Sequence, residues 1–338
     1  MKIHVNYPVM SRRLILRTSN DWDKDVEPEA HSAVGAVFDV DCRGSTISLK
    51  ACLRDGIDLH WCRGADYVLS AHDPDPDLWP YFFESDRGTV SEVMVFSHGD
   101  RSHSVRVYLP PGYAENHLRS FPVLYMQDGQ NLFFPQEAFG GREWRVDETM
   151  DRLDQMNAVR KAIVVGISPH DRHVDYTQPG YESYGHFITE VLKPKIDDHF
   201  RTRRSARDTV VMGSSLGGVV SLYLAWEYPQ VFGGAACLSS TFGYRDDLFD
   251  RIACEEKRAV RLYIDSGWPR DNFDATNAMR DLLMHRGFRL GVDLLQFSFP
   301  DATHNEGSWA GRLHLPFQYF FGRAGDAERN RSVSPEVA

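Results

Sequence analysis

The sequence lacks any apolar run that approaches the length of a membrane span. Its first residues, Met1 to Pro8, also lack the apolar core that a secretory signal peptide carries. A membrane-spanning helix needs about 20 mostly apolar residues in a row, so these absences exclude the usual sequence signals of insertion and export. We therefore expect a cytoplasmic protein with no membrane partner.

Cysteine is scarce. The chain contains five cysteines, an odd number, and no two of them form a Cys-x-x-Cys pair. This count and this spacing argue against both a disulfide framework and a zinc site. We expect reduced structural thiols and no bound metal. The five residues are Cys42, Cys52, Cys62, Cys237 and Cys254.

Long runs of one charge are missing as well. Lys and Arg number 38 and Asp and Glu number 48, which gives a net charge of -10, and the two signs are interspersed. A nucleic-acid-binding surface is therefore not expected. The hydrophobic content of 42% and the length of 338 residues predict instead a globular chain of about two domains.

Residues 1–90 are predicted to form a small N-terminal β-sandwich (Ig-like) domain. Short apolar runs recur between about residues 34 and 90, and turn sequences rich in Gly, Asp and Arg separate them. The clearest runs are 37–40 and 47–53, and strand-like aromatic residues follow at 81–83. The proline-rich and acidic segment 73–77 is expected to be a surface loop.

Residues 91–323 are predicted to form an α/β domain, specifically an α/β-hydrolase with a doubly wound sheet. Strand-like and helix-like segments alternate from about Ser91 onward, which is typical of a sheet covered by helices on both faces. The polar tail 324–338 lacks periodicity and is expected to be disordered. The expected strands are 93–97, 104–109, 123–126, 162–165, 209–212, 235–238, 262–265 and 294–299, and the expected helices are 146–155, 187–200, 218–228, 272–285 and 309–320.

The most informative motif is Gly-Ser-Ser-Leu-Gly-Gly at 213–218, which lies between an expected strand and an expected helix. A G-x-S-x-G sequence in this context is typical of a nucleophile elbow. Both glycines are needed because the turn is sharp and a side chain at either position would collide with the neighbouring strand or helix. The motif predicts Ser215 as a nucleophile.

A serine nucleophile needs a base, and in an α/β-hydrolase the acid and then the histidine follow the serine along the chain. The histidines after Ser215 are His285, His304 and His314. His285 and His314 fall in expected helices, whereas His304 follows the last expected strand. Catalytic groups of open α/β sheets gather in such loops, so we predict His304 as the base.

The acid is expected in the loop after strand 262–265, where Asp265, Asp271 and Asp274 compete. An acid that orients an imidazole needs reach over the sheet edge, which favours Asp271 in the body of the loop. Asp265 at the strand end is the alternative. Asp274 is more typical of the first turn of a helix.

Acyl transfer also needs hydrogen-bond donors for the developing oxyanion. We expect one from the backbone N–H of Leu216, at the start of the helix after the elbow. The second is expected from the N–H of Gln130, because the preceding Gly129 permits close backbone approach. Residues near the expected strand ends are further candidates for substrate binding: Arg172, whose guanidinium suits a carboxylate or phosphate, and the aromatic residues Trp144, Tyr176 and Trp268.

Three motifs resemble the esterase-D-like family of esterases, which includes enterochelin esterases, feruloyl esterases, S-formylglutathione hydrolases and mycolyltransferases. They are YMQDGQNLF at 125–133, GSSLGG at 213–218 and HNEGSW at 304–309. The segments 166–177 and 187–202 fit as well, although Asp175 stands where the family has glutamate. The resemblance spans about residues 91–322 and is specific for the family without indicating a substrate.

The resemblance implies Ser215 as nucleophile, His304 as base, Asp271 as acid and Gln130 as an oxyanion position. It also implies that the N-terminal region looks like the β-sandwich that precedes the hydrolase in enterochelin esterases. The expected function is a serine carboxylic ester hydrolase that acts on a small-molecule ester through an acyl-enzyme, without metal or organic cofactor. Two alternatives stay open: an acyltransferase that passes the acyl group to an alcohol or sugar, and a binding protein with a degenerate hydrolase domain.

Overall fold

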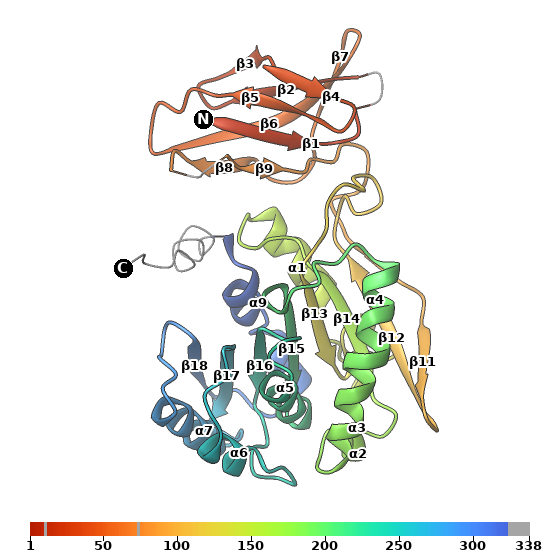
Figure 1. Ribbon diagram of the computed structural model, residues 1–338, viewed down its shortest axis with the longest axis vertical. Helices are drawn as coiled ribbons and strands as arrows, with labels where there is room; N and C mark the ends of the chain where they lie inside the picture. The colour runs from red at the N-terminus through yellow and green to blue at the C-terminus, as the bar shows by residue number, and fades with distance from the viewer. Residues whose placement is uncertain (10–11, 73–74, 324–338) are drawn as a thin grey trace.

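The computed structural model describes residues 1–9, 12–72 and 75–323 of the chain. Figure 1 shows a smaller body made of strands, coloured red and orange, next to a larger body in which helices cover both faces of a sheet. The tail 324–338, which was expected to be disordered, lies outside the described residues, as do residues 73–74 of the expected surface loop.

In the smaller body two sheets pack against each other. One has the strand order β4-β5-β1-β9, and the other has the order β3-β2-β6-β7 with β8 also paired to β6. Ile3 and Val5 alternate with more exposed residues along β1, and they share a core with Leu16 and Leu49 of the other sheet. This is the expected β-sandwich. Its strands are β1 (Lys2–Asn6), β2 (Arg13–Thr18), β3 (Asp21–Val26), β4 (Ala30–Ser32), β5 (Gly35–Asp39), β6 (Thr46–Asp55), β7 (Asp58–Trp61), β8 (Tyr67–Ser70) and β9 (Asp77–Leu78).

The sandwich begins earlier in the chain than the apolar pattern predicts, because β1 to β4 all precede residue 34. β3 and β4 lie at sheet edges and are largely exposed, so they carry polar and charged side chains instead of apolar alternation. The expectation of strand structure at 81–83 is wrong. Tyr81 and Phe82 are buried, but they belong to the loop that leads to the larger body.

The larger body contains one sheet with the order β10-β12-β14-β13-β15-β16-β17-β18, in which β11 also pairs with β12. From β14 to β18 all neighbouring strands are parallel, while β12 is antiparallel to β14. Every expected strand of this part is present. The strands are β10 (Thr89–Val90), β11 (Met94–His98), β12 (Arg101–Leu109), β13 (Val123–Gln127), β14 (Ile163–Ser168), β15 (Thr209–Ser214), β16 (Gly234–Leu238), β17 (Arg261–Trp268) and β18 (Leu294–Pro300).

Helices cover both faces because each central strand is apolar on both sides. Val123 and Tyr125 of β13 join the core beneath α3 to α7, whereas Leu124 and Met126 join the core beneath α1 and α9. No helix within the described ranges combines the length and the apolar character that crossing a membrane requires. The helices are α1 (Val146–Gln155), α2 (Arg172–Asp175), α3 (Gly180–His186), α4 (Lys193–His199), α5 (Leu216–Glu227), α6 (Leu248–Cys254), α7 (Phe273–His285), α8 (Glu306–Ala310) and α9 (His314–Phe321).

Two helix predictions need correction. The helix expected at 309–320 is split into α8 and α9, with Arg312 in the turn between them. The helix expected at 187–200 is part of a longer helical segment that starts with α3 at Gly180. α6 has no counterpart among the expected helices.

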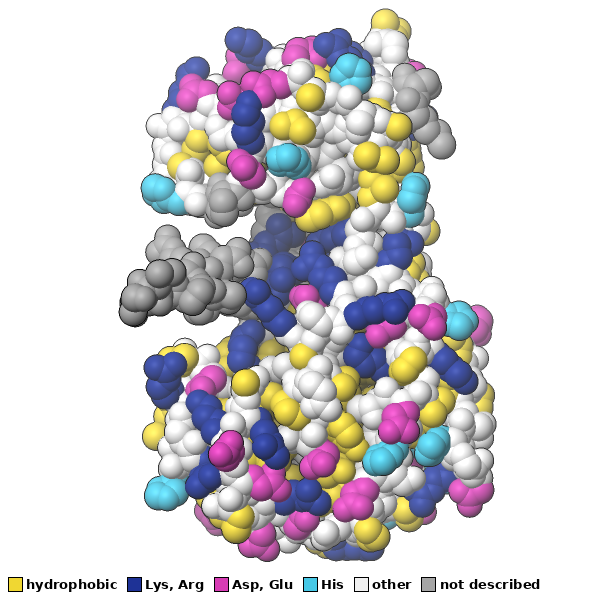
Figure 2. Space-filling model, in the orientation of Figure 1, with side chains coloured by type: hydrophobic (Ala, Val, Ile, Leu, Met, Phe, Trp, Pro, Cys, Tyr) yellow, Lys and Arg dark blue, Asp and Glu magenta, His cyan; other side chains and the backbone are white. Residues whose placement is uncertain are grey.

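The two bodies meet at the loop that precedes β13. The carboxylate of Glu115 accepts hydrogen bonds from sandwich-side residues, among them the hydroxyl of Tyr7 at 2.9 Å, and the amide of Asn116 donates to the carbonyl of Asn6 at 2.9 Å. This loop leads into the amino end of β13. Ser215 follows the carboxyl end of the parallel strand β15, so the contact between the bodies and Ser215 lie at opposite edges of the sheet. Figure 2 shows Lys and Arg side chains gathered at the waist between the two bodies.

Candidate active site

Ser215 lies in the sharp turn between β15 and α5. Its backbone has a φ of 57° and a ψ of -123°, a conformation that non-glycine residues rarely adopt. A Cβ atom at Gly213 would lie 2.5 Å from the backbone of Gly217, which is closer than real contacts allow. The glycines of the motif therefore let strand and helix pack tightly enough to hold the serine in this turn.

The carboxyl ends of neighbouring parallel strands bring the other polar residues close to Ser215. Ser215 follows β15, Asp271 lies in the loop after β17, and His304 follows β18. β15, β16, β17 and β18 are consecutive parallel neighbours, so the loops that follow them share one edge of the sheet.

His304 contacts Asp271 directly. The imidazole Nδ1 lies 2.6 Å from Oδ1 of Asp271, whose side chain is fully buried. The other carboxylate oxygen, Oδ2, accepts hydrogen bonds from the Ser239 hydroxyl at 2.5 Å and from the backbone N–H of Gly267 at 2.8 Å. Burial alone would raise the pKa of Asp271, but the hydrogen bonds from His304, Ser239 and Gly267 together hold it below its usual value.

Asp265, the alternative acid, has different partners. Its carboxylate lies 3.0 Å from the guanidinium of Arg312 and accepts a hydrogen bond from the hydroxyl of Tyr263 at 2.9 Å. Burial raises the pKa of Asp265 to about 6 despite the neighbouring Arg312. The described contacts of His304 thus include Asp271 and not Asp265.

Ser215 and His304 line the same pocket, which has a volume of about 330 Å³. Ser215 is 8% exposed, and the side chain of His304 is 37% exposed, so solvent reaches the imidazole. The pocket lining mixes charged, amide and aromatic side chains and contains no residue of the sandwich. The lining residues are Asp128, Gln130, Asn131, Phe139, Arg172, Ser214, Ser215, His304, Glu306 and Trp309.

The two expected oxyanion donors lie at helix starts. Leu216 is the first residue of α5, and Gln130 lies in a short 3-10 helix at Gly129–Asn131. The first N–H groups of a helix have no carbonyl partner inside it and are free to bind another acceptor. A Cβ at Gly129 would lie 2.5 Å from the carbonyl carbon of Gly166 in β14, so glycine is needed for this loop to pack against the sheet.

Arg172 lines the pocket, but its guanidinium already has a partner. Nε and Nη2 donate to the two carboxylate oxygens of Asp128, at 2.8 and 3.1 Å. Burial lowers the pKa of Arg172, and the charge of Asp128 more than offsets this, which leaves the pKa raised. A substrate carboxylate or phosphate that binds Arg172, as expected from the sequence, would therefore have to compete with the carboxylate of Asp128 for the guanidinium.

The three aromatic residues expected to shape the pocket are not in it, which corrects that prediction. Trp144 and Tyr176 are 1% and 0% exposed and belong to the cores on opposite faces of the sheet. The hydroxyl of Tyr176 accepts a hydrogen bond from the backbone N–H of Asp128 at 3.0 Å, so it supports the loop that carries Gln130.

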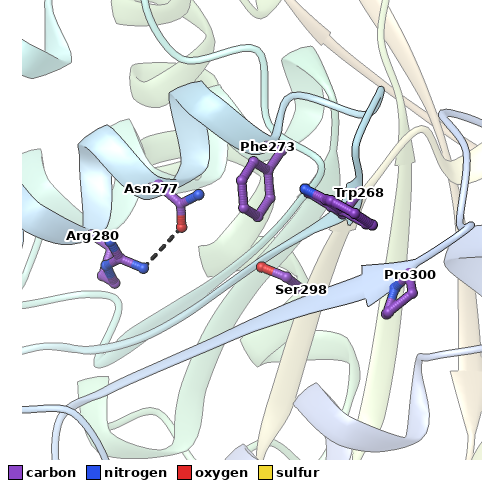
Figure 3. Close-up of a pocket in the computed structure, with 6 residues that line it drawn as sticks. All are labelled: Trp268, Phe273, Asn277, Arg280, Ser298 and Pro300. Atoms are coloured by element: carbon purple, nitrogen blue, oxygen red, sulfur yellow. Dashed lines mark hydrogen bonds between the residues drawn. The ribbon is translucent and has the colours of Figure 1, made fainter.

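Trp268 is 47% exposed and lines a different, open pocket of about 420 Å³ between α7 and β18. Figure 3 shows its ring beside Phe273 of α7, with Ser298 and Pro300 of β18 below and Arg280 hydrogen-bonded to Asn277. The position of an aromatic residue near a strand end thus does not determine which way its side chain points.

Several residues that line the pocket are not among those predicted from the sequence. Phe139 and Asn131 lie on the loop after β13, and Glu306 opens α8. Glu306 and Asn131 lie inside the motifs at 304–309 and 125–133. Their position in these motifs is the sequence signal that indicates a place near the site. Phe139 stands beside two glycines and has no motif of its own. Ser239, which follows β16 and does not line the pocket but donates to Asp271, has none either.

Comparison with known proteins gives the family of the chain. The family model described as "Putative esterase" matches residues 97–314, which is more than half of the chain. The uncharacterized protein YbbA of Bacillus subtilis (strain 168) is 25% identical over 174 residues, which cover 47% of this chain and 63% of YbbA. The chain therefore spans less than two thirds of the length of this curated relative.

Two solved structures share the fold. The enterobactin esterase FES of Shigella flexneri matches with a TM-score of 0.55 at 14% identity, over 94% of this chain and 92% of FES. A ferulic acid esterase of the anaerobic fungus Anaeromyces mucronatus matches with a TM-score of 0.54 at 16% identity, over 69% of this chain and 90% of the esterase. The FES match includes the β-sandwich, and it confirms the predicted fold class.

Proposed function

The chain belongs to the esterase family whose model it matches, and from this premise we propose that it is a serine carboxylic ester hydrolase. Ser215 is the nucleophile, His304 the general base and acid, and Asp271 the carboxylate that orients the imidazole. The observation that carries the proposal is the 2.6 Å contact of Asp271 with Nδ1 of His304, at the rim of the pocket that also contains Ser215.

The contact with Asp271 fixes the tautomer of His304. An ionised carboxylate accepts hydrogen bonds only, so Nδ1 carries the proton and Nε2 keeps a lone pair. Nε2 takes the proton of the Ser215 hydroxyl as Oγ attacks the ester carbonyl, and it then gives that proton to the leaving alcohol. Water, activated by the same imidazole, releases the acid from the acyl-enzyme, and Asp271 stays ionised throughout.

The backbone N–H groups of Leu216 and Gln130 are proposed to bind the oxyanion of the tetrahedral intermediates. Both belong to the first turns of their helices, and Gln130 and Ser215 line one pocket. The substrate is a small-molecule ester, since the pocket is confined to about 330 Å³. The amide and carboxylate groups of Asn131 and Glu306 favour an ester that carries polar substituents.

Hydrolysis of p-nitrophenyl acetate and p-nitrophenyl butyrate by the wild type and by Ser215→Ala tests the proposal. The variant is expected to lose at least about a thousandfold in kcat, because the acyl-enzyme cannot form. Labelling with a fluorophosphonate probe should likewise require Ser215. Equal rates of hydrolysis in the two proteins would contradict the proposal.

A further inference from the structure

A buried polar cluster surrounds Oδ2 of Asp271, the carboxylate oxygen that does not contact His304. It comprises Ser239 at the end of β16, Trp309 in α8, Arg312 in the turn after α8, and Asp265 in β17. Their exposed fractions are 0%, 5%, 3% and 0%. Trp309 also packs in the apolar core beneath α1 and α9 and against the ring of His304, with ring centroids 5.0 Å apart. Ser239, Asp265 and Arg312 are polar residues in a buried place, so their burial calls for a physical reason.

The Ser239 hydroxyl is the centre of the cluster. Its Oγ lies 2.5 Å from Oδ2 of Asp271, 3.0 Å from Nε1 of Trp309 and 2.6 Å from Nη2 of Arg312. The indole N–H and the guanidinium are donors with no accepting atom. Both therefore donate to Oγ and occupy its two acceptor positions.

This arrangement determines the direction of the third hydrogen bond. With both acceptor positions of Oγ occupied, the single hydroxyl proton of Ser239 is left to point at Asp271. The carboxylate oxygen Oδ2 then accepts hydrogen bonds from the Ser239 hydroxyl and from the backbone N–H of Gly267. A protonated Oδ2 would face two donors, so the cluster favours the ionised form of Asp271.

Arg312 is held in place by a second carboxylate. Its Nη2 lies 3.0 Å from Oδ1 of Asp265 and its Nε 3.1 Å from Oδ2, while the hydroxyl of Tyr263 donates to the same Oδ2. Nη2 also lies 3.7 Å from Oδ2 of Asp271. One buried guanidinium thus stands between two buried carboxylates and compensates their charge where water cannot.

We propose that Ser239 and Arg312 are positioning residues of the esterase reaction, which keep Asp271 ionised and aim its other oxygen at His304. The inference rests on the proposed function, because it assigns these residues a role in orienting the imidazole that activates Ser215. They act through Asp271 and do not line the pocket.

The test compares Ser239→Ala with Ser240→Ala. Ser240 is the adjacent residue, is equally buried, and its Oγ has no hydrogen-bond partner among the described residues, so it is a matched control. Ser239→Ala is expected to lower kcat for p-nitrophenyl acetate about ten- to a hundredfold with little change in KM, which corresponds to the loss of one hydrogen bond to a charged group. Ser240→Ala should retain the wild-type kcat.

The pH profile provides a readout that a merely structural role would not move. Without the Ser239 hydroxyl, the Asp271 carboxylate accepts one hydrogen bond fewer. Its negative charge is then less delocalised into hydrogen bonds and interacts more strongly with the imidazolium form of His304. The acidic limb of kcat/KM should therefore move to higher pH in Ser239→Ala and stay in place in Ser240→Ala. Arg312→Met should move it in the same direction, and Arg312→Lys, which keeps the charge, should move it less.

Thermal unfolding of each variant shows whether it is folded at the assay temperature. If Ser239→Ala is unfolded at that temperature, Arg312→Lys and Arg312→Met test the inference instead. The measurement is again the position of the acidic limb of the kcat/KM profile. A folded Ser239→Ala with the kcat and pH profile of Ser240→Ala would overturn the inference while leaving the proposed function intact. Absence of Ser215-dependent hydrolysis and labelling in the wild type would instead contradict the proposed function itself.

Discussion

Arg172 and Asp128 form a two-point ion pair at the wall of the pocket, with N···O distances of 2.8 and 3.1 Å. Asp128 has a φ of 55° and immediately precedes the 3-10 helix that contains Gln130. Its backbone N–H donates to Tyr176. Arg172 thus holds, through Asp128, the loop that presents the proposed oxyanion donor, and its charge is largely satisfied before any substrate binds.

We expect Arg172→Lys to lower kcat about ten- to a hundredfold with KM nearly unchanged. A lysine cannot make the two-point contact with Asp128, and a small displacement of an oxyanion donor is costly. Steady-state kinetics with a neutral p-nitrophenyl ester and with an ester that carries a carboxylate distinguish this role from substrate binding. A rise in KM confined to the carboxylate-bearing ester would show that Arg172 binds substrate directly.

The choice between the two acids is testable with isosteric changes. Asp271→Asn should lower kcat by about a thousandfold or more, because an amide at this position favours the wrong tautomer of His304. Asp265→Asn should cost less, about tenfold, since Asp265 acts on the imidazole only through Arg312 and Ser239. Both variants are to be assayed on p-nitrophenyl acetate at one pH. A larger loss for Asp265→Asn would reverse the assignment.

The raised pKa of Asp265 predicts a pH dependence of stability. In the folded state the pKa is about 6, above the ordinary value of 3.8 that applies when the chain is unfolded. The folded protein therefore holds this proton more tightly. The contribution of the protonated Asp265 to the free energy of unfolding is fully present below about pH 4 and is lost as the pH rises through 6.

The Asp265→Asn variant isolates this effect from all other titrating groups. The difference in unfolding free energy between variant and wild type should shift in favour of the variant by about 2 kcal/mol between pH 4 and pH 7. Urea unfolding at several pH values measures it. A difference that is independent of pH would show that Asp265 ionises normally in the folded protein.

Part of the candidate site could be read from the sequence because it depends on local geometry and on strand order. The motif around Ser215 requires glycines at fixed positions, and the position of His304 after the last strand follows from the topology of the fold. The loop that contains Asp271 is predictable for the same reason. In each case the chain position determines which edge of the sheet the residue reaches.

Other parts depend on contacts that chain position does not specify. Ser239 and Arg312 are 73 residues apart and meet because a turn splits the helix expected at 309–320. Trp144 precedes α1 and Tyr176 follows α2, and the rings of both lie in the cores. Side-chain direction is decided by packing, so a list of aromatic residues near the strand ends could not separate core residues from pocket residues.

Glu115 provides a test of whether the sandwich takes part in catalysis. Its Oε1 accepts from the Tyr7 hydroxyl at 2.9 Å and from the N–H of Phe82 at 2.7 Å, and its Oε2 accepts from the N–H groups of Phe83 and Glu84 at 2.8 and 2.9 Å. Removing the carboxylate leaves several partly buried donors without an acceptor.

Glu115→Ala should therefore lower the free energy of unfolding by about 2 to 4 kcal/mol, whereas Glu256→Ala, at an exposed position, should change it by less than about 0.5 kcal/mol. Because the pocket contains only residues of the larger body, kcat and KM of the folded Glu115→Ala should stay within about twofold of the wild type. Urea unfolding and ester hydrolysis below the unfolding transition measure the two effects separately. A change in KM of the fully folded variant would mean that the sandwich reaches the substrate. The contacts between the bodies argue against this, because they lie at the amino end of β13 and Ser215 lies at the carboxyl edge of the sheet.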